Sequence, residues 1–244
     1  MLKIPTSKFH ARASGFSIIE LAIVLAIVST LLGGLLLSLS EVRESNNRTD
    51  ANSTMDEIKE ALYGFAQANG RLPCPATTTS LGAEAPVGGG VCTQRYGFLP
   101  WATLGLSGPR NVNNLLMDSW LSPYRYNVSN ISASAFTTAG QMRTLGITAL
   151  APNLQICTIS TCGVGNVLVN SAPAVVISLG ANFATFTSAN ERANSGETTR
   201  NGYRQANNNN FVSTVYNEAT FDDMITWLSP SILYTRMIAA GQLP

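Results

Sequence analysis

Four cysteines are the residues of this chain best suited to covalent chemistry: Cys74, Cys92, Cys157 and Cys162. Their number is even, and each consecutive pair encloses a short stretch rich in glycine, serine or threonine. Such a set is typical of disulfides, and of the three possible pairings we expect Cys74 with Cys92 and Cys157 with Cys162. A zinc site made from all four thiolates is the alternative, but neither pair has the two-residue spacing common in zinc sites. We therefore expect two structural disulfides and no metal.

The other ionisable residues exclude several kinds of site. The only histidine, His10, lies before the first long apolar segment, so catalytic triads and zinc sites that need histidine are excluded from the rest of the chain. Charged residues make up 12% of the sequence and the net charge is +1, which leaves no strongly basic face for nucleic acid. The composition favours a role that is not enzymatic and uses no cofactor.

Glu20 is notable because it is the one carboxylate in an apolar run from Gly15 to Leu39. The part from Leu21 to Leu39 has no charge and, at about 1.5 Å per helical residue, can cross a hydrocarbon layer of about 30 Å. The residues before it carry three basic side chains and no acid, which predicts a cytoplasmic N-terminus: Lys3, Lys8 and Arg12. We expect a single-pass protein of the inner membrane, with its C-terminal domain outside the cytoplasm.

The residues around Glu20 also carry a resemblance to a known family. Gly15 is followed by FSIIEL, and small residues rather than apolar ones precede it. This junction resembles the class III leader of type IV pilins and type II secretion pseudopilins. The resemblance implies that a prepilin peptidase cuts between Gly15 and Phe16 and methylates the new amino group of Phe16. It also implies that Glu20 acts in assembly.

The energetic cost of a charge in a membrane also predicts that Glu20 acts in assembly. A carboxylate in a membrane-spanning helix costs roughly 2.5 to 3.5 kcal/mol at the centre, so it needs a partner. Phe16 and Glu20 are four residues apart and share a helix face, where the N-terminal amine of a neighbouring subunit can pair with the carboxylate. Extension of the Glu20 side chain to the lipid headgroups is the alternative.

A second resemblance lies in the segment MDSWLSPYRY. Four of its residues are similar to a signature found where the first strand of pseudopilin and minor-pilin domains begins: Asp118, Trp120, Pro123 and Tyr124. On physical grounds Asp118 caps a turn, Trp120 packs over a helix and Pro123 releases the chain into a strand. We expect a folding element here. A carbohydrate-binding platform made from Trp101 and Trp120 is the alternative.

Periodicity predicts an α+β fold around these residues. Apolar positions spaced by three or four residues predict an amphipathic continuation of the helix over residues 40–70: Met55, Ile58, Leu62, Phe65 and Ala66. The helix stops at Gly70, and its polar part from Ser45 to Thr54 is expected to bend or fray. Strands are predicted at 124–128, 154–159, 167–169 and 174–179, in a small antiparallel sheet packed on the helix.

The C-terminal part of the chain combines a polar stretch with a second helical pattern. Residues 187–210 are almost wholly polar and predict a long surface loop. Four acids invite comparison with a calcium loop, but their spacing matches none, so we expect no calcium site: Glu191, Glu197, Asp222 and Asp223. Six apolar residues predict a C-terminal helix: Met224, Ile225, Leu228, Ile232, Leu233 and Met237.

The expected organisation is a leader over 1–15, a transmembrane assembly helix over 16–39, its amphipathic continuation over 40–70 and a globular pilin-like domain over 71–244. The resemblance implies a structural subunit, minor or accessory, of a type IV pilus or related filament in the periplasm or at the cell surface. Its implied partners are prepilin peptidase, other pilin or pseudopilin subunits, an inner-membrane assembly platform and the lipid bilayer. The alternatives are a type II secretion pseudopilin and a membrane-tethered binding module that does not polymerise.

Overall fold

The computed structural model describes residues 17–185, 188–195 and 209–244, without the side chains of 34–40 and of Ala133. Its contacts divide the chain into two units, Met1–Asn46 and Asn47–Pro244, and each is described by itself. The helices are α1 (Ile18–Asn69), α2 (Trp101–Leu104), α3 (Ile131–Ser134), α4 (Gln141–Leu145), α5 (Ala189–Ser195) and α6 (Pro230–Ala239). The strands are β1 (Tyr96–Phe98), β2 (Arg125–Val128), β3 (Leu154–Cys157), β4 (Val167–Ala172), β5 (Ala174–Ser178), β6 (Asn210–Val212) and β7 (Met224–Trp227).

Helix α1 ends where the sequence predicts. Its last residue is Asn69, and Gly70 follows with φ +65°, a left-handed conformation that glycine adopts without a steric penalty. The backbone N–H of Gly70 donates to the carbonyl of Ala66 at 2.9 Å, which closes the last turn. The expected apolar stripe is confirmed at Ile58 and Leu62, which are fully buried.

The expected fraying between Ser45 and Thr54 is wrong, because this part of α1 is helical throughout. Tertiary contacts compensate for its weak helix formers. Ala51 is fully buried, and the Arg48 guanidinium lies 3.9 Å from the centre of the Tyr216 ring. Packing of the helix therefore outweighs the low propensity of its sequence.

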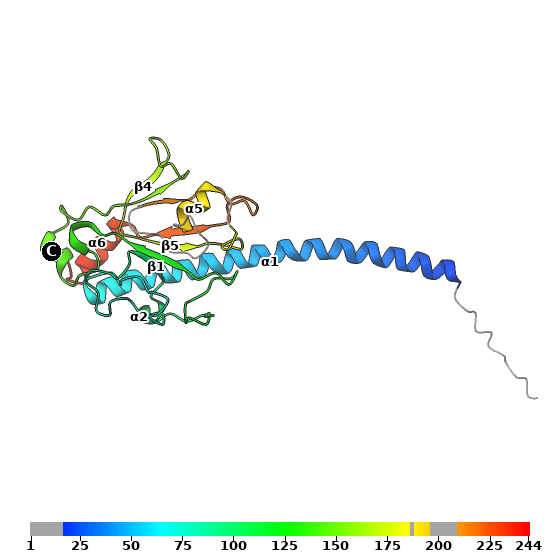
Figure 1. Cartoon of the computed structure of the whole chain (residues 1–244), viewed down its shortest axis with the longest axis horizontal. Coiled ribbons are helices and arrows are strands. Elements are labelled where there is room, and N and C mark those ends of the chain that lie inside the picture. Colours follow the sequence, from blue (N-terminus) through cyan, green and yellow to red (C-terminus); the bar gives the residue numbers. More distant parts are fainter. Residues whose placement is uncertain (1–16, 186–187, 196–208) are drawn as a thin grey trace, which may run out of the picture. The chain divides into compact units, whose positions relative to one another are not determined.

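Two sheets make up the strand structure of the unit Asn47–Pro244. The first is antiparallel, with strand order β1-β2-β5-β7. The second has the order β4-β3-β6, in which β3 pairs antiparallel with β4 and parallel with β6. Figure 1 shows β4 and the β3–β4 turn at the outside of this unit, and the turn residue Val164 is fully exposed. The small antiparallel sheet is confirmed, whereas the second sheet with its parallel pair was not expected.

Strand β5 separates two hydrophobic clusters. Its side chains alternate, so Ala174 and Val176 lie in a cluster with α1 and α6, while Val175 and Ile177 lie in a cluster with the second sheet. All four of these side chains are at most 2% exposed. The first sheet is thus covered on one face by helices and on the other by the second sheet.

The predicted helix at Met224 is wrong. Residues Met224–Trp227 form β7, paired with β5, and the C-terminal helix begins only at Pro230. Four consecutive apolar or threonine side chains suit a strand beside β5, and Pro230 takes the first helical position, where its missing N–H costs nothing. Within α6, Leu233 and Met237 are buried as expected, but Ile232 is exposed.

Candidate functional site

The first turns of α1 expose apolar side chains on every side. Ten of them expose between 43% and 89% of their surface, and we call them the apolar α1 surface: Ile18, Ile19, Leu21, Ile23, Val24, Leu25, Ile27, Val28, Leu31 and Leu32. Glu20 is the only charged residue between positions 17 and 33. A helix that is apolar all round is typical of one surrounded by other apolar groups.

The polar side chains within this surface bond to their own helix. The hydroxyl of Ser29 donates to the carbonyl of Leu25 at 2.5 Å, and that of Thr30 donates to the carbonyl of Ile27 at 2.8 Å. Hydroxyls bonded in this way need no water. The helix can therefore lie in an apolar environment without an unpaired hydroxyl donor at either position.

Glu20 forms a capping box with Ser17 at the start of α1. The backbone N–H of Ser17 donates to Oε2 of Glu20 at 3.3 Å, and the N–H of Ile19 donates to the hydroxyl oxygen of Ser17 at 3.3 Å. Such reciprocal bonds satisfy N–H groups that the first turn of a helix leaves unpaired. The carboxylate is exposed, so it remains accessible to a second partner.

Several expected features fall outside the described residues. Gly15 and Phe16 belong to the range 1–16, and the expected membrane span includes residues 34–40, whose side chains are not described. Among the helices of the described part, none combines the length and the apolar character that crossing a membrane requires. The cleavage site and the span therefore stay predictions.

Asp118 closes a tight turn that leads into β2. Its Oδ1 accepts the backbone N–H of Trp120 at 2.9 Å and that of Ser122 at 2.8 Å, and the Ser178 hydroxyl donates to its Oδ2. The expected cap is confirmed, and the bond to Ser178 also ties the turn to the end of β5. Trp120 is half-buried, and its packing over α1 stays a prediction.

Pro123 and Tyr124 complete this turn. Pro123 forms an isolated antiparallel bridge with Met117, and the N–H of Tyr124 donates to the carbonyl of Leu116 at 3.0 Å. Tyr124 is buried in the cluster beneath α1, and burial raises the pKa of its hydroxyl. These contacts hold the turn that leads into β2.

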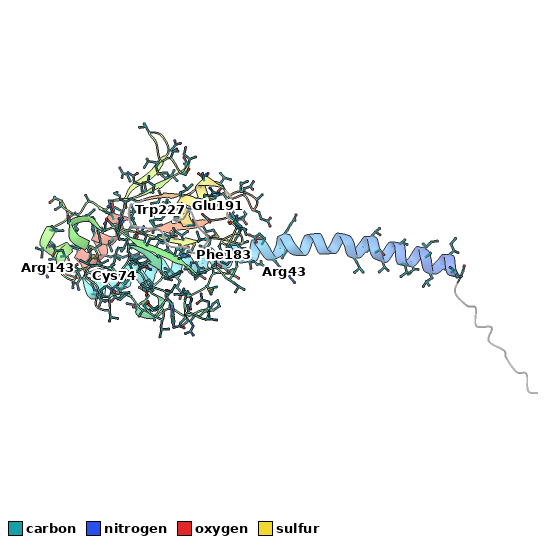
Figure 2. The ribbon with its side chains drawn as sticks, in the orientation of Figure 1. Arg43, Cys74, Arg143, Phe183, Glu191 and Trp227 are labelled. Atoms are coloured by element: carbon teal, nitrogen blue, oxygen red, sulfur yellow. A yellow bond between two sulfur atoms is a disulfide. The ribbon has the colours of Figure 1, made fainter. Side chains whose placement is uncertain are left out.

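Asp118 belongs to a group of four buried acids, the buried carboxylate cluster: Asp118, Glu191, Asp222 and Asp223. Asn182 links two of them, since its N–H donates to Oδ2 of Asp222 at 2.9 Å and its Nδ2 donates to Oε1 of Glu191 at 2.7 Å. The Nδ2 of Asn194 donates to Oδ2 of Asp223 at 2.8 Å. Glu191 projects from α5 (Figure 2).

Burial favours the protonated form of the three aspartates of this cluster, Asp118, Asp222 and Asp223. Burial, with a smaller contribution from the nearby Asp222, raises the pKa of Asp118 to about 6, although the hydrogen bonds from Ser178, Ser122 and Trp120 lower it. Burial also raises the pKa of Asp222 and of Asp223, and Glu191 adds to both shifts. Charges of one sign that share a dry site disfavour ionisation of each other.

The cluster includes three of the four acids that the sequence invites one to compare with a calcium loop. Glu197, the fourth, lies outside the described residues. Within the part of the chain that the structure describes, no three histidine, cysteine, aspartate or glutamate residues are placed to hold a metal ion.

The two disulfides have the expected pairing, Cys74 with Cys92 and Cys157 with Cys162. Trp101, the first residue of the alternative carbohydrate platform, is half-buried and held by contacts within the protein. Its Nε1 donates to the carbonyl of Asn114 at 2.7 Å, and the Arg110 guanidinium lies 4.5 Å from the ring centre. These contacts support the packing role of Trp101.

Sequence reasoning missed two capping boxes, although the pattern of serine followed three residues later by glutamate marks both. Ser17 and Glu20 form the first. Ser188 and Glu191 form the second, in which Ser188 N–H donates to Oε2 at 3.2 Å and Glu191 N–H donates to the hydroxyl oxygen at 3.1 Å. The electrostatic influence of Asp222 on Asp118 had no local signal, because the two residues lie far apart in the sequence.

Comparison of the chain with protein-family models, with curated proteins and with solved structures finds no match in any of the three.

Proposed function

We propose that this protein is a structural, pilin-like subunit that is cut after Gly15, methylated at Phe16 and assembled through the first part of α1. The observation that carries the proposal is the apolar α1 surface, which is exposed all round and contains Glu20 as its only charge. Contiguous exposed apolar surface of this kind favours packing against other helices or lipid. The proposal includes a membrane-anchored stage before assembly.

Two further observations support this role. The hydroxyls of Ser29 and Thr30 are bonded within the helix, which suits an apolar environment. Glu20 lies in the first turn, four residues after Phe16 in the sequence, and its exposed carboxylate can pair with the amine of a neighbouring copy. Catalysis has no place in this function.

Peptide mass spectrometry of the N-terminus tests the processing step. Protein from the membrane fraction and protein sheared from the cell surface are compared in the native host. Methylated Phe16 in the sheared material is the expected result. Methylated Phe16 confined to membranes would favour a periplasmic pseudopilus or a tethered binding module, and an intact leader from Met1 would contradict the proposal.

Substitution of Glu20 separates pairing with a neighbour from capping of the helix. Glu20→Ala removes both interactions, whereas Glu20→Gln keeps an oxygen that can accept the Ser17 N–H but carries no charge. We expect both variants to reduce the sheared protein at least about tenfold, because an ion pair is lost in each. Glu41→Ala, at an exposed position of α1, is the matched control and should assemble normally. Normal assembly of Glu20→Gln would show that capping alone suffices.

A further inference from the structure

Helix α5 and the residues before it, 180–185 and 188, are held in place mainly by polar contacts, and we call them the α5 segment. The side chains that the helix buries are all polar: Glu191, Asn194 and Ser195. Phe183 packs against a hydrophobic cluster but is only partly buried. An element with little buried apolar surface opens more easily than the strands beside it. The partners of its polar groups therefore decide how firmly the α5 segment is held.

Asn194 attaches α5 to two strands and to Asp223. Its side chain donates to the carbonyl of Val212 at 2.9 Å and to Oδ2 of Asp223 at 2.8 Å, and it accepts the N–H of Val212 at 2.7 Å. Its backbone carbonyl accepts the hydroxyl of Tyr96 at 2.6 Å. Asp223 is 7% exposed, so its bond to Asn194 lies inside the protein.

The start of the α5 segment is attached to a second aspartate, Asp222. The backbone N–H of Asn182 donates to its Oδ2 at 2.9 Å. A Cβ on Gly180 would lie 2.5 Å from Cγ of Asp222, so the chain passes directly over this carboxyl group. Asp222 is fully buried, and within the described residues its Oδ1 accepts no hydrogen bond. A negative charge on Asp222 is therefore only partly compensated.

Acidic groups face these two aspartates from other elements. Glu191 of α5 faces both, and Asp118, in the turn before β2, faces Asp222. Within the described part of the chain, no ion pair joins Asp222 or Asp223 to a basic side chain, and Arg192 of α5 is exposed. Burial raises the pKa of both aspartates, with a smaller contribution from Glu191. Ionisation of the pair thus places like charges in a buried site.

The α5 segment also forms part of the wall of a cavity of about 440 Å³. Phe183 and Ser195 belong to its lining, and Figure 2 marks Phe183 and Glu191 on the segment. Among the described residues that line the cavity, Arg125 of β2 is the one with a charge, and its guanidinium lies 4.2 Å from the centre of the Phe98 ring. Movement of the α5 segment away from the sheets would open this cavity.

We propose that protons on Asp222 and Asp223 form a pH-sensitive switch, which holds the α5 segment on the sheets at low pH and releases it as pH rises. When both carboxyls are neutral, the bonds from Asn182 and Asn194 hold the segment in place. When the protons leave, the two negative charges lie beside Glu191 and repel each other. Opening of the segment brings water to these charges, while β5 and β7 stay paired. The switch does not depend on assembly through α1.

The direction of the switch follows from the protons that each form binds. In the open form water surrounds both carboxyls, so their pKa returns toward the ordinary value of 3.8. In the closed form the pKa is higher, so at intermediate pH the closed form holds protons that the open form has lost. Rising pH therefore favours the open form, by about tenfold for each unit of pKa shift.

Amide hydrogen exchange, followed by nuclear magnetic resonance in the full-length protein in detergent, measures this opening. The N–H groups of Asn182 and Val212 report on the α5 segment, because they donate to the side chains of Asp222 and Asn194. The N–H of Leu228 donates to a carbonyl of β5 and reports on the sheet. Protection is corrected for the intrinsic pH dependence of exchange.

We expect protection at Asn182 and Val212 to fall at least about tenfold between about pH 5 and about pH 8. At about pH 8 it should also lie at least about tenfold below the protection at Leu228, because the α5 segment opens while the sheet stays paired. Protection that does not depend on pH would overturn the proposal. Protection equal to that of Leu228 at about pH 8 would overturn it too, since the segment would then open only together with the sheet.

A double variant, Asp222→Asn with Asp223→Asn, keeps the switch neutral at every pH. Both asparagines retain an oxygen that can accept the bonds from Asn182 and Asn194. Protection at Val212 should then change less than about threefold over the same range. Glu218→Gln removes an acid at an exposed position and is the control, which should keep the natural pH dependence. A natural pH dependence in the double variant would assign the protons to other groups and overturn the proposal.

Discussion

The pH dependence of stability should reveal the proton on Asp118. This side chain is 2% exposed, and burial raises its pKa from 3.8 to about 6. Between those two values the folded chain holds a proton that the unfolded chain has lost, so the free energy of unfolding falls as pH rises. A shift of about two units corresponds to about 3 kcal/mol, present below pH 3.8 and lost above about pH 6.

Asp118→Asn should remove this dependence. An asparagine keeps an oxygen for the N–H groups of Trp120 and Ser122, and its amide can donate to the Ser178 oxygen. The stability of the variant relative to the natural protein should therefore increase by about 3 kcal/mol between about pH 4 and about pH 7. Asp50→Asn, exposed on α1, is the control and should follow the natural protein.

Chemical denaturation of the full-length protein in detergent, repeated at intervals across this range, measures the difference. Asp222 and Asp223 are unchanged in the variant, so the difference between the two proteins reports the proton on Asp118 together with its coupling to Asp222. A constant difference between variant and natural protein at every pH would refute the reasoning. It would mean that the pKa of Asp118 is no higher in the folded chain than in the unfolded chain, despite its burial.

Three further substitutions test the fold by denaturation. Replacing Cys74 and Cys92 by serine should lower the free energy of unfolding by about 3 kcal/mol, because the disulfide no longer restricts the loop between them in the unfolded chain. Reduction of the natural protein breaks this disulfide as well as Cys157–Cys162 and should lower the free energy of unfolding by at least as much. Gly70→Ala should lower the free energy of unfolding by about 1 kcal/mol, because φ is +65° and the new Cβ would lie 2.6 Å from Oε1 of Gln242. Its control is Gly64→Ala, in the middle of α1, where a Cβ would have no heavy atom within 4 Å. This substitution should raise the free energy of unfolding by about 0.5 kcal/mol. Glu84→Gln leaves the buried guanidinium of Arg71 without its charged partner and should lower the free energy of unfolding by about 3 kcal/mol. A decrease of less than about 1 kcal/mol would contradict the importance of the Arg71–Glu84 ion pair.

Local patterns predicted the elements whose signals lie within a few residues. The end of α1 at Gly70 and the strand Ala174–Ser178 followed from glycine chemistry and β-branched residues. The strand Met224–Trp227 was mistaken for a helix because its apolar residues are also spaced for one. Only its pairing with β5, far away in the sequence, decides between the two.

The candidate site shows the same division. The turn at Asp118 could be predicted from the residue types alone, since aspartate side chains commonly accept backbone N–H groups in turns. The electrostatic influence of Asp222 on Asp118 could not be predicted, because nothing near either residue in the sequence marks the other. The parallel pairing of β3 with β6 could not be predicted for the same reason, because the two strands lie far apart in the sequence and nothing near either one marks the other.

The alternation along β5 determines where this chain tolerates extra residues. Since neighbouring side chains of β5 enter opposite clusters, one inserted residue would turn every following side chain to the wrong face and disturb both clusters together. The turn around Val164 has the opposite character, because its side chain is fully exposed and the Cys157–Cys162 disulfide fixes the chain beside it. An epitope tag or a reporter peptide placed after Val164 should therefore leave the folded unit intact.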